Sequence, residues 1–577
     1  MLPYTKILTY LQNRHRGLLL SLLLAVALIY IPYINNPLFF DDLPFFGNAV
    51  NNFASDPWHI NSRWLPYMSL AWTVTAFSDT PLPLHLGNLL LHFANTVLVF
   101  ILLQQLSSVV LNKHRQDINS QTADQTNTQA TNQTITTISS LPTFFTAPSN
   151  WGAWLGALAF ACHPVAVYAV GYVVERSIVM ATFFTLAMQL AYIHGLVSST
   201  KLQQTIWLAV SVLFYVCAVF SKEHSLIAPA LLAAITLLIK PSIQTNWRAI
   251  SAAWLGLIVI AILVALRSRG ITTTLEHDAT ALITQQGIAS TTENVQLLSM
   301  VTQAGLFFKY LFLWLVPNPA WMSIDMREPF ASTLGTWQNG LKVAFFIAYG
   351  AIALKLLLKR GKAGLLGFAL LYPWMLFFIE FTSVRVQEPF VLYRSYLWAP
   401  GLLLLIPLAL ESLPKQKVMI VAFAVVILAM IPLSWNRLNV FSDEYKLWND
   451  AASLLKSESQ PGAARIFYNR GLAELHQQKP KAAVQDFKRV LAIDSTIYQA
   501  HVNLGSAYLG TGQFKEALAS VNQAIAIKPD DAQTYFVKAF ALKRLNDKAG
   551  ALEAFTKSCA LKNVSACLVV SLMSKSK

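Results

Sequence analysis

The chain has few charged residues: Asp, Glu, Lys and Arg make up 12% of its 577 residues, about half of their share in soluble domains. Hydrophobic residues make up 55% and come in runs long enough to cross a bilayer, which excludes an ordinary soluble enzyme and a disordered protein. Cysteine is scarce too. Four cysteines without a CxxC pair exclude a zinc ribbon and a dense disulfide scaffold. The composition predicts a polytopic membrane protein.

The charge that is present is mostly positive, with 43 Lys and Arg against 28 Asp and Glu and a net charge of +15. A nucleic acid would suit this charge. In so apolar a chain, basic cytoplasmic loops account for it more economically, because positive residues concentrate on the cytoplasmic side of membrane proteins. We therefore expect membrane lipids, and no nucleic acid, among the partners.

The apolar runs predict about eleven spanning helices in a membrane domain at 1–440. The first run, 17–34, follows Lys6, Arg14 and Arg16 and is too long for a cleaved signal sequence. The N-terminus is therefore expected in the cytoplasm. The other ten runs lie at about 82–106, 151–170, 177–196, 205–220, 225–240, 251–266, 341–358, 365–381, 396–410 and 418–435.

Charge and polarity predict the loops. Residues 35–80 carry four Asp against one Arg, so this loop and the loop 268–338 are expected outside the cytoplasm. The Gln-, Thr-, Asn- and Ser-rich stretch 114–150 predicts a disordered cytoplasmic loop. Segment 295–316 is apolar, but the basic cluster at 359–362 requires the following span to enter from the outer side. We therefore expect an interfacial or re-entrant helix there, and an odd number of spans, which places the C-terminal region outside.

The C-terminal domain, 441–577, is more charged and rich in alanine, and its small residues recur at an interval of 34 residues. The series are Gly471, Gly505 and Ala539, and Ala483, Ala517 and Ala551. This is the period of tetratricopeptide repeats, in which small residues let paired helices approach. We expect repeats at 464–497, 498–531 and 532–565 and a closing helix. The whole chain is thus predicted to be all-α, a polytopic helix bundle followed by an α-solenoid that either binds a polypeptide or acts as a spacer.

Two adjacent carboxylates, Asp41 and Asp42, follow the first predicted span. Carboxylates near a bilayer are costly unless water, a cation or a substrate hydroxyl compensates them. One of them can take a proton from an acceptor hydroxyl as a general base. The alternative is a solvated pair in a loop.

Other ionisable residues gather at the predicted outer ends of spans or on one face of the second span. Basic side chains there offer donors to a phosphate oxygen. Interhelical hydrogen bonds, solvated turns and contacts with lipid headgroups are the alternatives. The candidates are His85, His163, Glu175, Arg176, Lys222, Glu223, Arg267 and Arg394.

Several motifs together suggest a family. They are Phe39-Phe40-Asp41-Asp42, Arg63-Trp64-Leu65-Pro66, His85-Leu86-Gly87-Asn88, Cys162-His163-Pro164, Val174-Glu175-Arg176, Lys222-Glu223-His224 and Tyr393-Arg394. In this order, and followed by the repeats, they make the chain resemble the transmembrane-and-tetratricopeptide-repeat O-mannosyltransferases. That family is part of the multispan glycosyltransferases of the C type.

The resemblance implies an enzyme that moves a sugar from a polyprenyl-phosphate lipid to a hydroxyl of an exported protein, such as a pilin, recruited by the repeats. It implies a catalytic carboxylate at Asp41 or Asp42. The donor phosphate and sugar would lie near Arg394, Arg267, Lys222, Glu223, Glu175, Arg176, Arg63, His85, His163 and Tyr393. We expect no metal and no other cofactor, because the lipid phosphate is already a leaving group. The sequence resembles bacterial enzymes, so the inner membrane is expected, with the active site and the repeats on the periplasmic side.

Three other functions remain as alternatives to this prediction. They are a membrane-anchored repeat scaffold for envelope assembly, a transporter or lipid flippase, and a transferase that modifies glycolipids or polysaccharides. An anchor needs only one or two spans, and a transporter would place charges near mid-membrane.

Cys559 and Cys567 are expected on the outer side, where disulfides form. The short connection 561–563 would fold two helices together and bring the sulfurs within range, and the eight-residue spacing resembles disulfide-linked Sel1-like repeats. Two unpaired, partly buried thiols are the alternative. The other two cysteines lie in predicted spans and are expected to be reduced.

The predicted topology places Ser120 in the cytoplasm and Gln513 on the opposite side of the membrane. In cells carrying Ser120→Cys or Gln513→Cys, an impermeant thiol reagent should label only the cysteine at 513. Labelling of both positions from outside would show that the span count is wrong.

Overall fold

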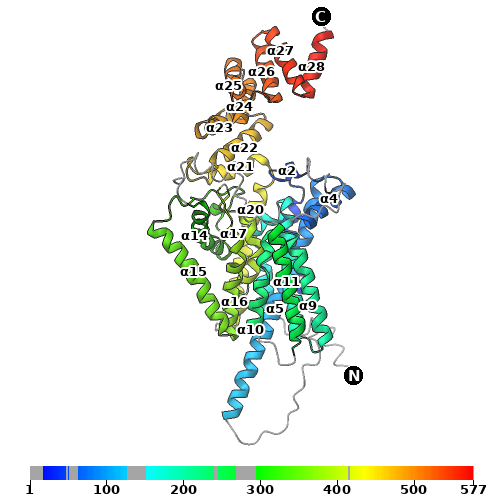
Figure 1. Ribbon diagram of the computed structural model, residues 1–577, viewed down its shortest axis with the longest axis vertical. Helices are drawn as coiled ribbons and strands as arrows, with labels where there is room; N and C mark the ends of the chain where they lie inside the picture. The colour runs from blue at the N-terminus through cyan, green and yellow to red at the C-terminus, as the bar shows by residue number, and fades with distance from the viewer. Residues whose placement is uncertain are drawn as a thin grey trace. The chain divides into compact units, whose positions relative to one another are not determined.

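The computed structural model describes residues 17–46, 50, 53, 63–125, 151–239, 245–267, 294–386, 388–412 and 416–575 (Figure 1). These residues form helices and loops and include no β-strand. The chain divides into two compact units. The bundle unit comprises Met1–Met322 and Phe330–Ser442, and the repeat unit comprises Ser323–Pro329 and Asp443–Lys577.

Eight helices of the bundle unit are long and apolar enough to cross a membrane, by length and composition, among the residues that the structure describes. They are α5 (Pro81–Gln125), α8 (Arg176–Val197), α9 (Lys201–Val219), α11 (Trp247–Arg267), α14 (Val295–Leu315), α15 (Trp337–Leu358), α16 (Gly361–Leu376) continued by α17 (Phe378–Thr382), and α20 (Gln416–Val440). A ninth candidate is the pair of α6 (Trp151–Cys162) and α7 (Val167–Val170) with its preceding turn, bent by 47°.

Three predicted spans correspond to shorter apolar helices in the structure: Gly17–Tyr33, Glu223–Ile239 and Ala399–Ser412. The second contains α10 (Pro229–Ile239), and the third is broken into α18 (Ala399–Leu402) and α19 (Leu405–Ser412). Proline explains the breaks, because it removes a backbone donor and clashes with the preceding turn. The count of eleven spans therefore stays a prediction.

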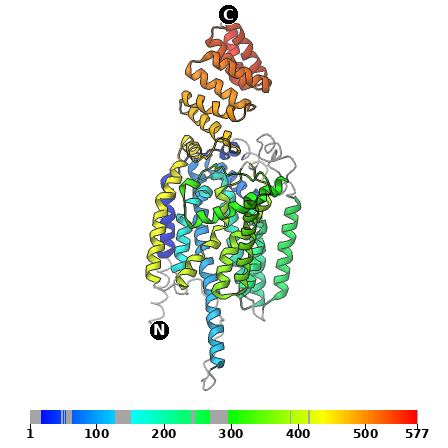
Figure 2. The ribbon, with the colours of Figure 1, turned by 90° about the vertical axis from the view of Figure 1, so that its left-hand side faces the viewer.

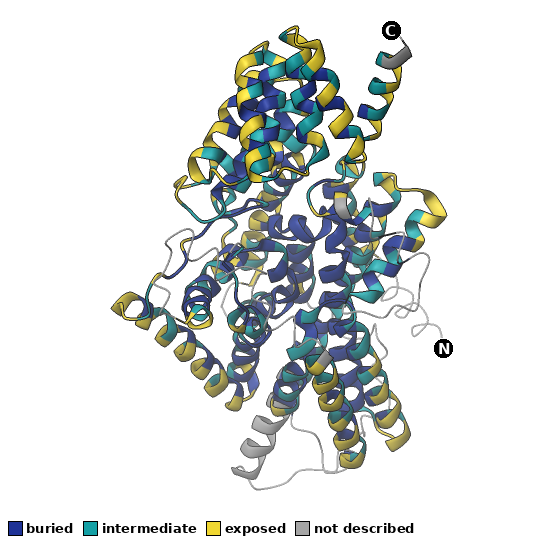
Figure 3. Cartoon of the chain, turned by 45° about the horizontal axis from the view of Figure 1, so that its top comes forward, coloured by how far each residue is buried: buried dark blue, intermediate teal, exposed yellow. Residues whose placement is uncertain are grey.

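The outer helices of the bundle unit expose rows of large apolar side chains. On α20 these are Val418, Val421, Val425 and Leu428, each 59% exposed or more. Figure 3 shows the buried residues gathered inside the bundle unit and exposed residues along its outer helices. Continuous apolar surface of this extent is typical of contact with lipid or with another protein.

The predicted disordered loop 114–150 is corrected in its first part, because α5 continues as a helix to Gln125. No proline or glycine interrupts the sequence between 111 and 125, so nothing in the backbone ends the helix there. Residues 126–150 lie outside the described part of the chain. Figures 1 and 2 show α5 extending past its neighbours.

The two predicted outer loops contain helices that the sequence analysis treated differently. Loop 35–80 contains α4 (Trp64–Phe77), which the sequence analysis did not predict. Loop 268–338 contains α14, the expected interfacial helix. Side chains along the whole length of α14 donate hydrogen bonds to the segment 383–395. The bonds run from Ser299 to Ser383 O (2.9 Å), Gln303 to Pro389 O (2.8 Å), Tyr310 to Val391 O (3.1 Å) and Trp314 to Ser395 (2.9 Å). By length and composition α14 could also cross a membrane, so its interfacial position stays a prediction.

The repeat unit is an α-solenoid of paired helices, as predicted. The pairs are α22 (Ala463–His476) with α23 (Pro480–Ile493), α24 (Tyr498–Thr511) with α25 (Phe514–Ile527), and α26 (Ala532–Arg544) with α27 (Lys548–Ala560). α21 (Glu444–Ser453) precedes them and α28 (Val564–Lys575) closes the series. The repeated small residues mark close helix contacts: a Cβ at Gly471 would lie 3.0 Å from the Phe487 ring, and one at Gly505 would lie 2.6 Å from Val521.

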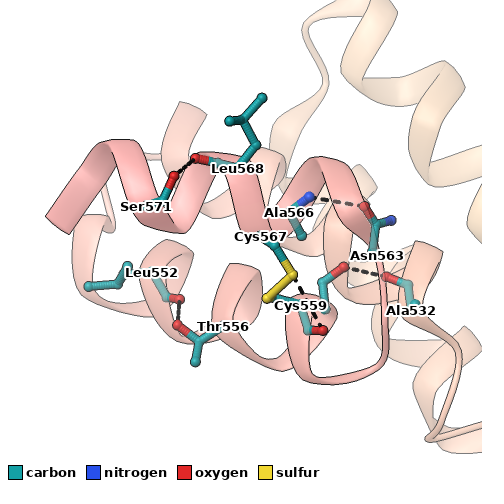
Figure 4. The surroundings of a disulfide bond; sticks show 10 residues. Ala532, Leu552, Thr556, Cys559, Asn563, Ala566, Cys567, Leu568 and Ser571 are labelled. Atoms are coloured by element: carbon teal, nitrogen blue, oxygen red, sulfur yellow. Dashed lines mark hydrogen bonds between the residues drawn. A yellow bond between two sulfur atoms is a disulfide. The ribbon is translucent and has the colours of Figure 1, made fainter. Parts of the chain in front are cut away.

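A disulfide joins Cys559 of α27 to Cys567 of α28, with a Cα–Cα distance of 4.6 Å (Figure 4). The helix connection explains the pairing. Lys562 adopts a left-handed conformation (φ 71°) that ends α27, and the Asn563 side chain accepts a hydrogen bond from Ala566 N (3.0 Å) at the start of α28. The expected bridge is therefore present. Cys162 and Cys217 are not disulfide-bonded.

Removing this disulfide should destabilise the C-terminal end of the solenoid. The bridge closes a loop over a sequence separation of 8 residues, which contributes about 2–3 kcal/mol in the chain-entropy model. In urea-dependent proteolysis of the purified full chain, the paired change Cys559→Ser and Cys567→Ser should lower the midpoint for α26–α28. A reducing agent should lower the wild-type midpoint equally and leave the variant unchanged. A wild-type midpoint that ignores the reductant would contradict the assignment.

Candidate functional site

Asp41 and Asp42 lie in different environments although they are adjacent. Asp42 is 1% exposed, and its carboxylate accepts a hydrogen bond from Val174 N at 2.7 Å. Burial raises the pKa of Asp42 to about 8, although backbone hydrogen bonds oppose the shift. Asp41 is exposed and donates its backbone N–H to the hydroxyl of Tyr172 (2.9 Å). Asp42 is therefore fixed in the interior, whereas its neighbour Asp41 is an exposed residue.

The residue before them has an unusual backbone conformation. Phe40 has φ 55°, in the left-handed region that bulky residues rarely adopt. Its ring lies against Tyr172, with the two ring centroids 6.3 Å apart. Strain of this kind persists only where the surroundings fix it, and it is frequent at functional sites.

A pair of tyrosines links Asp41 to two buried cations. Tyr172, which binds the Asp41 backbone, lies 6.3 Å from Tyr393 between ring centroids. The Tyr393 ring in turn lies 4.7 Å from Lys222 Nζ and 5.9 Å from the Arg394 guanidinium carbon. The structure thus brings these predicted site residues together at one end of the bundle unit, named here the aspartate end.

The two buried basic residues are paired with carboxylates. Lys222 Nζ lies 2.5 Å from Glu175 and 3.2 Å from the Ser177 hydroxyl. Arg394 donates to Glu380 at 2.7 Å. Their side chains are only 2% and 6% exposed. The structure thus shows each of these cations in an ion pair, and the expectation that Lys222 and Arg394 face the donor phosphate stays a prediction.

Glu380 is the carboxylate at the centre of these interactions. It is fully buried and accepts from His224 (2.6 Å) and Arg394, and Arg385 lies 3.6 Å away. Glu388 lies 3.7 Å from Arg394 on the other side. The sequence analysis did not single out Glu380 or Arg385. A lone glutamate inside the apolar run 365–381 is the signal that identifies such a residue, because intramembrane carboxylates are rarely retained without a function.

A second pair, Arg63 and Glu223, lies at the exposed edge of this set. The Arg63 guanidinium donates to both oxygens of Glu223, at 2.8 and 3.3 Å. The Arg63 side chain is 36% exposed and that of Arg385 is 22% exposed, far more than Lys222 or Arg394. The charge cluster, as we name it, comprises Arg63, Glu175, Lys222, Glu223, Glu380, Arg385, Glu388 and Arg394. Its formal charges balance, and its two accessible cations are Arg63 and Arg385.

Three predicted site residues lie apart from the charge cluster and have local partners. Arg176 donates to Asn88 and to Leu84 O, both at 2.8 Å, and so ties α8 to α5. His85 bonds to Asn36 O at 3.0 Å. His163 accepts a hydrogen bond from Val165 N and stacks on Trp314, with ring centroids 4.2 Å apart. The side chain of Arg267, the remaining predicted cation, lies outside the described part of the structure.

The described residues contain no group of three His, Cys, Asp or Glu side chains arranged to hold a metal ion. The carboxylates of the charge cluster instead accept from basic side chains. Its chemistry is therefore that of ion pairs with one exposed carboxylate, Asp41, at the margin.

Comparison with known proteins concerns the repeats. Two family models described as tetratricopeptide repeat match residues 474–539 and 449–496. Serine/threonine-protein phosphatase T of Trypanosoma brucei brucei is 32% identical over 80 residues, 14% of this chain and 17% of that protein. The BBSome complex member BBS4 homolog of Drosophila melanogaster is 24% identical over 105 residues, 18% of this chain and 22% of that protein. The chain thus spans less than a quarter of either relative's length. A crystal structure of MamA protein shares 18% identity and covers 26% of this chain and 82% of that one, with a TM-score of 0.19.

The raised pKa of Asp42 gives a testable dependence on pH. The pKa of Asp42 is about 8 in the folded chain and about 3.9 in an unfolded one, so the protonated side chain favours the folded state. This contribution to the free energy of unfolding is complete at low pH and is lost as the pH rises through about 8. In detergent, the thermal midpoint of the wild type should therefore fall relative to Asp42→Asn as the pH rises. The exposed neighbour supplies the control, since Asp41→Asn should keep the wild-type dependence. If the thermal midpoints of the wild type and Asp42→Asn changed in parallel with pH, the pKa of Asp42 would not be raised.

Proposed function

We propose that the chain is an integral-membrane glycosyltransferase that moves a sugar from a polyprenyl-phosphate lipid to a hydroxyl of an exported protein. The observation that carries this proposal is the charge cluster beside an exposed carboxylate at one end of an apolar bundle. Buried ion pairs contribute little net stability compared with apolar packing. Their concentration at one end therefore indicates a site where charge is handled during a reaction.

Asp41 is the general base in this proposal. Its carboxylate accepts the proton of the acceptor hydroxyl as the hydroxyl oxygen attacks the anomeric carbon of the sugar. The new carbon–oxygen bond forms while the bond from that carbon to the phosphate oxygen breaks, and the electron pair leaves with the lipid phosphate. A single attack inverts the anomeric centre. Asp42 is unsuited to this role near neutral pH, because a pKa of about 8 keeps its proton in place.

The leaving phosphate requires cations that can reach it. Arg63 and Arg385 are the accessible members of the charge cluster, and a guanidinium donates two parallel hydrogen bonds to phosphate oxygens. Lys222 and Arg394 then act indirectly, because they hold Glu175 and Glu380 in position. Donors preorganised in this way stabilise the charge that develops on the leaving group.

Two observations support a common side for the site and the repeats. The chain leaves the bundle unit at the aspartate end, where Asn36 donates to Leu438 O (3.0 Å) and Phe39 packs on Phe441. α5 also begins at this end and runs away from it, and its apolar part of 30 residues covers about 45 Å, enough for a bilayer. The Cys559–Cys567 disulfide suits an oxidising compartment. The periplasmic face of a bacterial inner membrane fits both.

The repeats suggest the class of acceptor. Tetratricopeptide solenoids present a continuous surface to polypeptides, and the repeat unit would bind an exported protein. The rival is a scaffold without catalysis, and the match of the repeats alone would suit it equally well. The buried charge cluster favours the enzyme, since an anchor needs no ion pairs inside its helix bundle.

Replacing the proposed base tests the function. Asp41→Asn should lower sugar transfer to exported proteins by about 10²–10⁴-fold, with normal expression and membrane insertion, because the amide cannot accept the hydroxyl proton. The matched control is Asp79→Asn, which alters another exposed aspartate of the same loop region and should keep wild-type transfer. Transfer is measured as glycosylated acceptor in cells that lack the wild-type copy. Full transfer by Asp41→Asn would show that Asp41 is a solvated loop residue and not the general base.

A further inference from the structure

A short stretch of the loop between α14 and α15 folds as part of the repeat unit. Ser323–Pro329 belongs to the repeat unit, although the residues on both sides of it belong to the bundle unit. The chain therefore passes between the units after Met322, after Pro329 and after Ser442. We name Ser323–Pro329 the strap.

The strap is held in the repeat unit by buried charge. Asp325 and Arg327 are 5% and 4% exposed and lie 2.6 Å apart. Asp325 also lies 2.9 Å from Arg465 Nε, at the start of α22, and Arg327 donates to Pro461 O at 3.2 Å. Burial opposes ionisation of Asp325, yet the two arginines outweigh it and lower its pKa. The clasp therefore stays charged at neutral pH.

A glycine makes room for the clasp. Gly462 has φ +79°, and a Cβ at this position would overlap the Arg327 guanidinium. The connection between α24 and α25 offers a comparison: Gly512 has φ +80°, but nothing lies within 4 Å of the Cβ position. The two glycines have the same backbone conformation, and only Gly462 receives a side chain from another segment.

Both ends of the strap are fixed in the bundle unit, and one of them lies beside Arg385 of the charge cluster. On one side, Met322 O accepts from Arg437 at 2.7 Å. On the other, Phe330 and Ala331 pack in a buried cluster with Leu298, Val301, Val384 and Val386. The last two residues flank Arg385, an accessible cation of the charge cluster, whose backbone N–H donates to Ser299 of α14 (3.0 Å).

We propose that the strap couples the repeat unit to the donor site, so that engagement of an acceptor polypeptide by the repeats alters the position of α14 and Arg385. A displacement of the repeat unit pulls the strap through the clasp of Asp325, Arg327 and Arg465. The strap passes the displacement to Phe330 and Ala331 through the two residues 328 and 329. Because the coupling is reciprocal, donor occupancy equally biases the repeats. The functional part of this inference rests on the proposed glycosyl transfer, whereas the mechanical link does not.

Hydrogen exchange of the full chain in lipid nanodiscs tests the link without any substrate. Gly462→Ala displaces Arg327, and should speed amide exchange several-fold in 323–329 and also in α14 and 383–386. Gly512→Ala imposes the same backbone strain without touching the strap, and should leave all three segments at wild-type rates. Faster exchange confined to 323–329, or the same pattern in Gly512→Ala, would overturn the proposal.

A second variant covers the case in which Gly462→Ala unfolds the repeats. A flexible Gly-Ser insertion after Pro329 keeps every clasp contact but loosens the covalent link. It should leave 323–329 and α22 protected while exchange in α14 and 383–386 becomes faster. Unchanged exchange in α14 would refute the proposed coupling through the strap. Since neither readout involves sugar transfer, a failure of the proposed enzyme activity would be seen separately, as unchanged transfer by Asp41→Asn.

Discussion

The cost of burying charge governs the aspartate end of the bundle unit. An ion taken from water into a protein interior loses several kcal/mol of solvation unless a partner replaces the water. Here the two buried cations of the charge cluster each have a carboxylate: Lys222 has Glu175, and Arg394 has Glu380. Glu380 has three basic partners and joins α17 to the turn before α10 and to the turn Leu392–Leu397 before α18. Removing it would take a buried partner from His224 and leave Arg394 only the more distant Glu388, so this carboxylate holds together the segments that meet here.

That constraint also divides the roles of the residues. Side chains that neutralise each other deep in the bundle are the least accessible to a substrate, whereas those at the margin are more exposed. Asp41, Arg63 and Arg385 lie at the margin. Asp42, Lys222 and Arg394 lie behind them and hold the backbone and the carboxylates in position. The arrangement resembles a preorganised site, in which a buried frame orients a few exposed groups.

The sequence predicted the helical class and the solenoid because both depend on periodic patterns. Apolar runs identify candidate spans, and the 34-residue recurrence of Gly471, Gly505 and Ala539 identifies paired helices. Proline breaks such as those in 399–412 were missed because hydropathy ignores the backbone. The ion pairs could not be predicted, since Lys222 and Glu175 are 47 residues apart and pairing leaves no periodic signal. The strap shows this most clearly, because its Asp325 pairs with Arg465, which lies 140 residues further along the sequence.

The central claim is that this chain transfers a sugar to exported proteins, and intact-mass spectrometry of those proteins tests it most directly. In a strain from which the gene is deleted, at least one exported protein should lose the mass of a whole number of sugar residues. Restoring the gene should restore that mass. The observed mass would also identify the sugar and the acceptor. Identical masses for every exported protein in the deletion strain and its parent would contradict the account and leave the repeats as a membrane-anchored scaffold.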